Sequence, residues 1–165
     1  MLKIEYRFVQ YEKNLSPKCK NELLHNEAYL LLDTMLNEIG INNYEIKKSP
    51  LGKPYIDGLG VHFSISHTDK MVCCVVSDRE CGIDCEIIAP RDKIKEMTDR
   101  FFVGDEAIIM EKHNYSYEEF LRIWTCKEAV GKRLGCGFMK SRNIDSTKEN
   151  CSTIIENGYI ITVNV

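Results

Sequence analysis

Residues 82–87 (Gly-Ile-Asp-Cys-Glu-Ile) alternate between apolar and acidic side chains. Side chains on a β-strand point to opposite faces in turn, so Asp84 and Glu86 share one face and the apolar side chains share the other. This alternation predicts a half-buried strand, and therefore a sheet with one packed face and one polar face. Two carboxylates on one face repel each other unless water or a cation lies between them. The pair therefore fits either a solvated strand face or one side of a cation site.

A second segment, residues 124–132 (Trp-Thr-Cys-Lys-Glu-Ala-Val-Gly-Lys), has the periodicity of a helix. Trp124 and Glu128 lie four residues apart, so Glu128 continues an apolar stripe and is expected either at the edge of the core or buried with a partner. Lys132 follows one turn later, in the orientation that favours a helical ion pair with Glu128. On the pattern alone, this is an ordinary pair contributing about 0.3–0.5 kcal/mol, and Lys127 is a solvated charge.

The rest of the chain predicts further short strands and amphipathic helices. Before residue 80, we expect a helix that begins at Ser16-Pro17 and stops at Gly40, and strands at 2–9, 44–48, 61–66 and 71–77. After residue 80, we expect helices at 92–101, 104–112 and 116–134 and a hairpin at 152–163 about Asn157-Gly158. An antiparallel meander is expected from the strands at 61–66, 71–77 and 82–88. Each half therefore combines helix with a small antiparallel sheet, which is an α+β organisation.

Length and charge limit the classes of protein that this chain can represent. One domain spanning residues 1–165 is the simplest organisation, and 44% hydrophobic residues suffice for a sizeable core. The net charge of -3, without a basic run, argues against a nucleic-acid partner. No apolar run approaches the length of a membrane span, so we expect no membrane association.

Eight cysteines are many for a chain of this length. The N-terminal segment lacks the apolar core of a secretory signal. No Cys-x-x-Cys pattern occurs, which argues against a zinc site. Several cysteines occupy apolar positions, among them Cys73, Cys74 and Cys85, where a thiol behaves as a small hydrophobic group. We therefore expect reduced thiols in a cytoplasmic protein.

The segments at 82–86 and 124–132, in this order and spacing, resemble the paired signatures of 4'-phosphopantetheinyl transferases. The Asp-x-Glu form of the first segment and the tryptophan that opens the second resemble the Sfp type of this superfamily rather than its short trimeric members. Further pieces match in sequence order: residues 52–54, residues 63–67, residues 100–102 with Glu106, and residues 135–137. The resemblance extends from about residue 16 to about residue 145.

The resemblance implies a fold of two similar α+β halves related by a pseudo-twofold, at about residues 1–80 and 81–165, with the active site in the cleft between them. It also implies a monomer. The implied activity is transfer of the 4'-phosphopantetheine group from coenzyme A to a serine hydroxyl of an apo-acyl or apo-peptidyl carrier protein, with release of adenosine 3',5'-bisphosphate. Carriers of fatty-acid, polyketide and peptide synthesis fit the sequence equally well.

The resemblance also implies a divalent cation, which Asp84, Glu86 and Glu128 would hold together with pyrophosphate oxygens. Mg²⁺ prefers such a mixture of carboxylate, water and phosphate ligands. Oxygen ligands suit Mn²⁺ as well, so the residues do not separate the two metals.

Two lysines and two glutamates carry the catalytic roles that the resemblance implies. Lys132 would stabilise the leaving phosphate, with help from Lys127. Glu128 is the first candidate for the general base that accepts the proton of the serine hydroxyl, although binding a metal would lower its basicity. Glu106 is the alternative base, because the family pattern puts an acid near the cation at this position.

Four residues of the first half would bind the coenzyme according to the resemblance. Lys53 and Pro54 lie in a loop whose family counterpart contacts the nucleotide. Ser66 and His67 end a strand, and the family pattern makes His67 a contact for the coenzyme's phosphate, with Ser66 beside it as a further coenzyme-binding residue. Relatives often carry arginines near the first helix, whereas this region offers Lys13, Lys18, Lys20 and His25. Lysine binds phosphate as a point charge, without the two-pronged geometry of arginine.

Two rival functions stay open at this point. A module that binds coenzyme A or a carrier protein without catalysis could keep the fold, but it has no need of three acids around a metal. A metal-dependent hydrolase that cleaves the pyrophosphate of coenzyme A would use the same metal and would replace the serine of the carrier with water.

Overall fold

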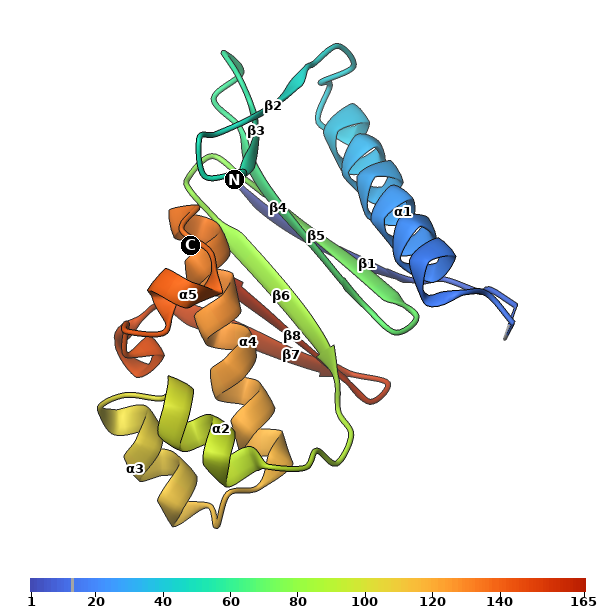
Figure 1. The fold of residues 1–165 in the computed structure, drawn as a ribbon. Coiled ribbons are helices and arrows are strands. Elements are labelled where there is room, and N and C mark those ends of the chain that lie inside the picture. The colour runs from blue at the N-terminus through green and yellow to red at the C-terminus, as the bar shows by residue number, and fades with distance from the viewer. Residues whose placement is uncertain (13) are drawn as a thin grey trace.

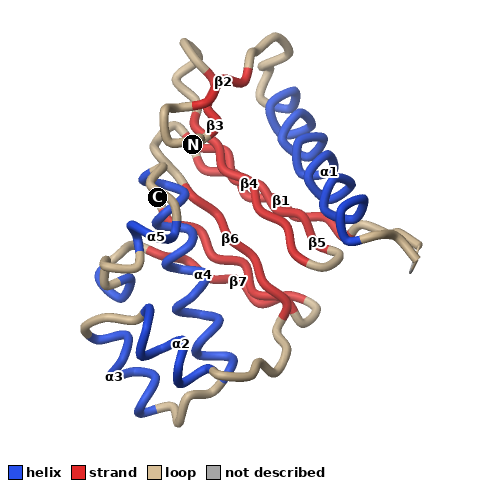
Figure 2. The backbone as a smooth tube through the Cα atoms, in the orientation of Figure 1, coloured by secondary structure: helices blue, strands red, loops and turns tan. Residues whose placement is uncertain are grey.

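The first half of the chain forms a three-stranded antiparallel sheet covered on one face by a long helix (Figures 1 and 2). The computed structural model describes residues 1–12 and 14–165, and the side chains of all of these except residues 138 and 139. The elements of this sheet are, in spatial order, β1 (Leu2–Phe8), β5 (Met71–Ser77) and β4 (His62–Thr68), with α1 (Pro17–Glu38) packed on them. Two short strands, β2 (Ile46–Lys48) and β3 (Pro54–Ile56), pair with each other.

Helix α1 has the predicted start and stop. The Ser16 side chain accepts a hydrogen bond from the backbone N of Cys19 at 3.2 Å, and Pro17 occupies the first turn. Gly40 follows the end of the helix with φ +83°, a conformation that glycine adopts at little cost. The face of α1 toward the sheet buries six residues, namely Leu24, Ala28, Leu31, Leu32, Met35 and Leu36.

The second half repeats this arrangement with more helices. It runs through β6 (Gly82–Ile87), α2 (Ile94–Phe101), α3 (Asp105–Lys112), α4 (Tyr117–Leu134), α5 (Phe138–Ser141), a 3₁₀ turn (Ser146–Lys148), β7 (Cys151–Glu156) and β8 (Tyr159–Asn164). The three strands form a second antiparallel sheet in the order β6-β8-β7, and α4 lies across it (Figure 1). The hairpin turns at Asn157 and Gly158, which both have positive φ, as the Asn-Gly pair predicts.

The two halves share one topology. Each consists of a strand, a helix and a hairpin whose second strand inserts between the first strand and its own partner, giving the orders β1-β5-β4 and β6-β8-β7. The predicted α+β fold class with two similar halves is therefore confirmed, although no repeat is visible in the residues themselves.

The predicted meander is wrong in its third strand. β4 and β5 pair as expected, but β6 pairs with β8, with Gly82 opposite Asn164 and Ile87 opposite Tyr159. Ile83 and Cys85 on β6 face an apolar cluster shared by the two sheets, whose other members include Met71, Cys73, Val75, Ile161 and Val163. β6 pairs in the second sheet because this pairing buries the apolar face that the two sheets share. The alternation of residues along one strand does not show which strand will be its partner.

A disulfide joins Cys126 on α4 to Cys151 at the start of β7, with Cα atoms 6.2 Å apart. The expectation that all cysteines are reduced is therefore wrong for this pair. The two residues lie 25 positions apart and become neighbours only when β7 joins the sheet beneath α4. The other six cysteines are free.

Within the described ranges, no helix combines the length and apolar character that crossing a membrane requires.

Gly82 allows α4 to rest directly on the backbone of β6. A Cβ atom at this position would lie 1.9 Å from the carbonyl oxygen of Ala129 and 2.6 Å from the backbone N of Arg133. Both are helix backbone atoms, which cannot move aside as a flexible side chain can. The contact therefore requires glycine.

We predict that Gly82→Ala destabilises the protein by about 3 kcal/mol or more, because the added methyl group must push α4 away from its sheet. Denaturant unfolding measures the loss. Gly58→Ala is the matched control, since Gly58 has φ +76° and open space around it, so it should lose only about 1 kcal/mol from backbone strain. Equal losses in the two variants would contradict the close approach of α4 to β6.

Candidate active site between the halves

The edge strands of the two sheets, β4 and β6, meet through side chains. Ser64 and Ser66 alternate with apolar residues on β4 and turn toward β6. The Ser64 hydroxyl accepts a hydrogen bond from the backbone N of Ile83 at 3.2 Å, and the Ser66 hydroxyl donates to Oδ1 of Asp84 at 2.9 Å. Asp84 is 6% exposed and Ser66 is 8% exposed, so this contact is shielded from water.

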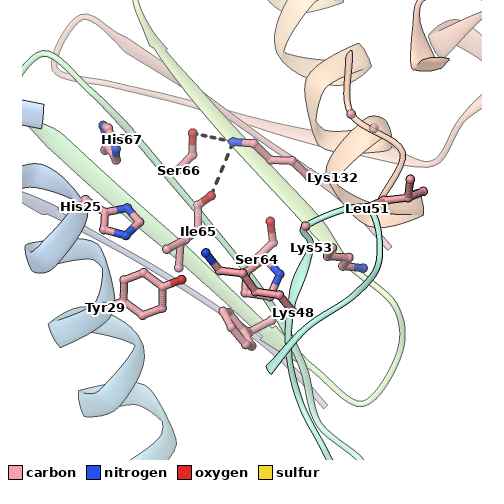
Figure 3. A pocket seen from close by; sticks show the side chains of 16 residues that line it. His25, Tyr29, Lys48, Leu51, Lys53, Ser64, Ile65, Ser66, His67 and Lys132 are labelled. Carbon is pink, nitrogen blue, oxygen red and sulfur yellow. Dashed lines mark hydrogen bonds between the residues drawn. The ribbon is translucent and has the colours of Figure 1, made fainter. Parts of the chain in front are cut away.

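Lys132 on α4 completes a closed group with these residues. Its Nζ donates to Oδ1 of Asp84 at 2.8 Å. It also donates to the hydroxyl of Ser66 at 2.8 Å and reaches the carbonyl oxygen of Ile65 at 3.5 Å (Figure 3). Burial disfavours the charged ammonium, but the charge and hydrogen bond of Asp84 outweigh this cost and raise the pKa of Lys132. The predicted pair of Lys132 with Glu128 is thus replaced by a pair with Asp84.

Glu86 has a different counter-ion. Arg91, in the loop after β6, donates from its guanidinium to Oε2 of Glu86 at 2.6 Å, and the Thr68 hydroxyl lies 3.5 Å from the same oxygen. Burial, opposed by Arg91 and reinforced by Asp84, raises the pKa of Glu86. Sequence reasoning missed Arg91 because it lies outside both signature segments.

Glu128 is the third acid of this group. It is half-buried on α4, and among the described residues its carboxylate has no hydrogen-bond or ion-pair partner. Burial and the charge of Asp84, opposed by Lys132 and reinforced by Glu86, raise the pKa of Glu128 to about 7. The acids are thus close enough to repel one another.

The three carboxylates outnumber the two cations, Lys132 and Arg91, that pair with them. The group therefore carries an excess of negative charge. Among the described residues, however, no three His, Cys, Asp or Glu side chains are grouped closely enough to hold a metal ion by themselves.

A pocket of about 520 Å³ opens beside Ser66 and Lys132 (Figure 3). The residues predicted to bind the coenzyme line it together: Lys53, Pro54, Ser66, His67 and Lys132. Its other walls come from α1, β2 and the glycines at the end of α4, and include His25, Tyr29, Lys48, Gly131 and Gly137. Lys127, predicted to accompany Lys132 here, does not line this pocket.

His25 lines the pocket, although sequence reasoning gave it no functional role. Its ring lies 4.9 Å from that of Tyr29 and 6.4 Å from that of His67, between centroids. Its spacing of four residues from Tyr29 on α1 is the signal that could have placed both on one helix face. Burial, His25 and Lys132 together lower the pKa of His67, opposed by Asp84.

Lys53 lines the pocket but directs its ammonium toward the end of α4. Its Nζ donates to the carbonyl oxygen of Arg133 at 2.6 Å and also pairs with Glu80. A cation is favoured at a helix C-terminus, where carbonyl groups lack helical partners.

Glu106 and Lys127 lie away from this group and pair with each other. Both side chains are 0% exposed, and the Lys127 Nζ donates to the two Glu106 oxygens at 2.8 and 2.7 Å. Glu106 also accepts from the backbone N of Val103 and from the backbone N and hydroxyl of Ser146. Neither side chain can reach a substrate in this arrangement, so the structure does not support Glu106 as a base or Lys127 as a phosphate ligand.

The remaining lysines near α1 do not gather at the pocket. Lys20 pairs with Asp69 at 3.1 Å, and Lys18 is exposed beside Glu22. Lys13 lies outside the described residues.

Comparison with known proteins supports the resemblance of the signature segments. Residues 80–160 match the family model of the 4'-phosphopantetheinyl transferase superfamily. The 4'-phosphopantetheinyl transferase gsp of Aneurinibacillus migulanus is 35% identical over 135 residues, covering 79% of this chain and 54% of that protein. The 4'-phosphopantetheinyl transferase Sfp of Bacillus subtilis is 29% identical over 142 residues, covering 79% of this chain and 62% of that protein.

A third relative is the 4'-phosphopantetheinyl transferase HetI of a Nostoc strain, 32% identical over 107 residues, covering 62% of this chain and 45% of that protein. The chain thus belongs to the 4'-phosphopantetheinyl transferase superfamily, and the resemblance to the Sfp type is confirmed. The chain spans about half of the length of gsp and of HetI.

We predict that Lys127→Met destabilises the protein by about 3–5 kcal/mol, because it leaves the buried Glu106 carboxylate without its counter-ion. The double variant Lys127→Met with Glu106→Gln should recover part of this loss, since both charges are then absent. Denaturant unfolding of the two single variants and the double variant measures the coupling. Lys95→Met removes an exposed lysine that pairs with Asp99 and serves as the control. Additive losses would contradict the buried pair.

We predict a pH dependence of stability from Glu128. Its pKa rises from 4.5 to about 7 on folding, so between these values the folded protein binds more protons than the unfolded chain. Stability from this group is present at low pH and is lost as the pH rises through about 7. The melting temperature of the parent should therefore fall relative to that of Glu128→Gln between pH 5 and pH 8. Glu118→Gln, an exposed change on the same helix, controls for the loss of one charge. Parallel curves for the parent and Glu128→Gln would refute the shift.

Proposed function

We propose that this protein transfers the 4'-phosphopantetheine group of coenzyme A to a serine hydroxyl of an apo-carrier protein, and that adenosine 3',5'-bisphosphate leaves. The observation that carries the proposal is the junction of β4, β6 and α4. There Lys132 donates a hydrogen bond to Asp84, and the charges of both residues shift the pKa of Glu128. A pocket of suitable size for a coenzyme lies beside them. The superfamily to which the chain belongs and the activity for which its relatives are named support the same proposal.

The pocket supplies the groups that an anionic nucleotide needs. Lys48 and Lys132 present ammonium groups, and Tyr29 from α1 and His67 from β4 present rings and polar tips (Figure 3). Ammonium groups in a concave, partly desolvated site attract phosphates more strongly than the same groups in open water. We therefore propose coenzyme A as the occupant, with its pyrophosphate toward Lys132.

The acids beside the pocket suit a divalent cation. Asp84, Glu86 and Glu128 offer oxygen donors with an excess of negative charge. Mg²⁺ commonly binds through one or two carboxylates, waters and substrate phosphates rather than through a complete protein cage. We propose that these residues, together with waters and pyrophosphate oxygens, hold Mg²⁺ or Mn²⁺. When bound, the ion would neutralise charge that builds up on the pyrophosphate oxygens.

The side chains of the chain then have separate roles in the displacement. The serine oxygen forms a bond to the phosphorus that carries pantetheine, and the bond from that phosphorus to the bridging oxygen breaks. Lys132 would stabilise the negative charge on the leaving phosphate. Glu128 would take the proton of the serine, directly or through a water, because it is the half-buried acid of the group that has no counter-ion among the described residues. Asp84 holds Lys132 in place.

The direct test is incubation with coenzyme A, Mg²⁺ and an apo-carrier protein, followed by mass spectrometry of the carrier. A gain of one phosphopantetheine mass is the expected result. Cleavage of coenzyme A without modification of the carrier would favour a pyrophosphate hydrolase instead. Binding of coenzyme A without any turnover would favour a non-catalytic module. Carriers of fatty-acid, polyketide and peptide synthesis should be compared in this assay. A separate measurement, native mass spectrometry of the protein, tests the proposed monomer and should give the mass of one chain.

We predict that Asp84→Ala and Glu128→Ala each lower the rate of transfer at least about a hundred-fold, because one removes the counter-ion of Lys132 and the other removes the base. Transfer is measured by the mass assay, and circular dichroism checks that each variant is folded. Asp99→Ala, a change at an exposed acid that pairs with Lys95, should retain full activity. Wild-type rates in either of the first two variants would remove that residue from the mechanism.

A further inference from the structure

The Ser66 hydroxyl is one of three groups that are joined pairwise by hydrogen bonds into a closed ring. It donates to Oδ1 of Asp84 at 2.9 Å and accepts from Nζ of Lys132 at 2.8 Å, while Lys132 donates to Asp84 at 2.8 Å. Each group thereby contacts both of the others. The hydroxyl uses its proton on the carboxylate and a lone pair on the ammonium, so its hydrogen-bonding capacity is largely spent within the ring.

This ring connects three separate elements. Ser66 comes from β4 in the first half, Asp84 from β6 and Lys132 from α4 in the second half. A lysine side chain is flexible, and fixing its ammonium in one position costs conformational entropy. Two short, charge-assisted hydrogen bonds from different elements are what offset that cost here.

The neighbouring hydroxyl separates this role from simple adhesion of the halves. Ser64, two residues earlier on the same face, accepts from the backbone N of Ile83 and so joins strand to strand. The Ser66 hydroxyl instead forms its hydrogen bonds, within the described part of the chain, with the charged side chains of Asp84 and Lys132. Ser64 therefore binds the backbone of β6, whereas Ser66 binds the two ionised side chains.

We propose that Ser66 is a positioning residue, which fixes the Lys132 ammonium against Asp84 for the chemical step, rather than a coenzyme-binding residue as the family resemblance suggested. This inference rests on the proposed function. Its consequence concerns kinetics. A residue that aligns a catalytic group contributes mainly to kcat, whereas a substrate ligand contributes to KM for coenzyme A.

The experiment compares Ser66→Ala, Ser66→Thr and Ser77→Ala. Ser77 is a buried serine at the end of β5 whose hydroxyl accepts from the backbone N of Arg79 at 3.1 Å, outside the pocket. In the transfer assay, Ser66→Ala should lower kcat about ten- to a hundred-fold, a typical effect of losing alignment. Its KM for coenzyme A should stay within about two-fold of the parent's. Ser66→Thr keeps the hydroxyl and should restore most of kcat, and Ser77→Ala should keep both constants.

A second readout does not depend on turnover. In protein labelled at lysine Cε, the Lys132 signal, assigned with Lys132→Arg, should move toward the position of mobile lysines in Ser66→Ala and stay unchanged in Ser77→Ala. A rise in KM with kcat retained would overturn the proposal and make Ser66 a substrate ligand. So would an unmoved Lys132 signal. If the parent modifies no carrier, the proposed function fails on its own, and the lysine signal still decides the role of Ser66.

Discussion

The contact of β6 with its two neighbours is the constraint on which the rest of the structure depends. On one side, Gly82 lets the backbone of α4 approach the strand so closely that no other residue fits. On the other side, the hydroxyls of β4 replace the ladder of backbone hydrogen bonds that a single continuous sheet would have. Because β6 is held in this way, the acids of the strand, the lysine of the helix and the pocket of the first half all meet at one junction.

This junction also explains the unusual balance of charge. Asp84 and Glu86 each pair with a cation, but Glu128 lies beside them, and burial together with the charge of Asp84 raises its pKa. Such a group is stable at neutral pH only because one proton can be shared or a cation can be recruited. In the proposed reaction, such an arrangement would offer one acid to accept a proton while the nearby lysine stays charged.

Much of this could be predicted from the sequence, because short-range patterns determine strands, helix caps and the Asn-Gly hairpin. The alternation at 82–87 predicted the face that Asp84 and Glu86 share, and the family signatures predicted most of the residues around the pocket. Pairings between distant segments could not be predicted. The partner of β6 and the burial of Lys127 with Glu106 both depend on how the two sheets and the helices pack. The periodicity of a helix does not distinguish a lysine that would bind phosphate from a lysine that is buried in an ion pair within the core.

The bond between Cys126 and Cys151 has a consequence for the chain as a polymer. It closes a covalent loop across 25 positions that contains Glu128 and Lys132. A loop of this size restricts the unfolded ensemble by about 3–4 kcal/mol in the chain-entropy description. The part of the molecule that carries Glu128 and Lys132 is thus prevented from expanding fully even when packing is lost, so it begins any refolding with α4 already tethered to the start of β7.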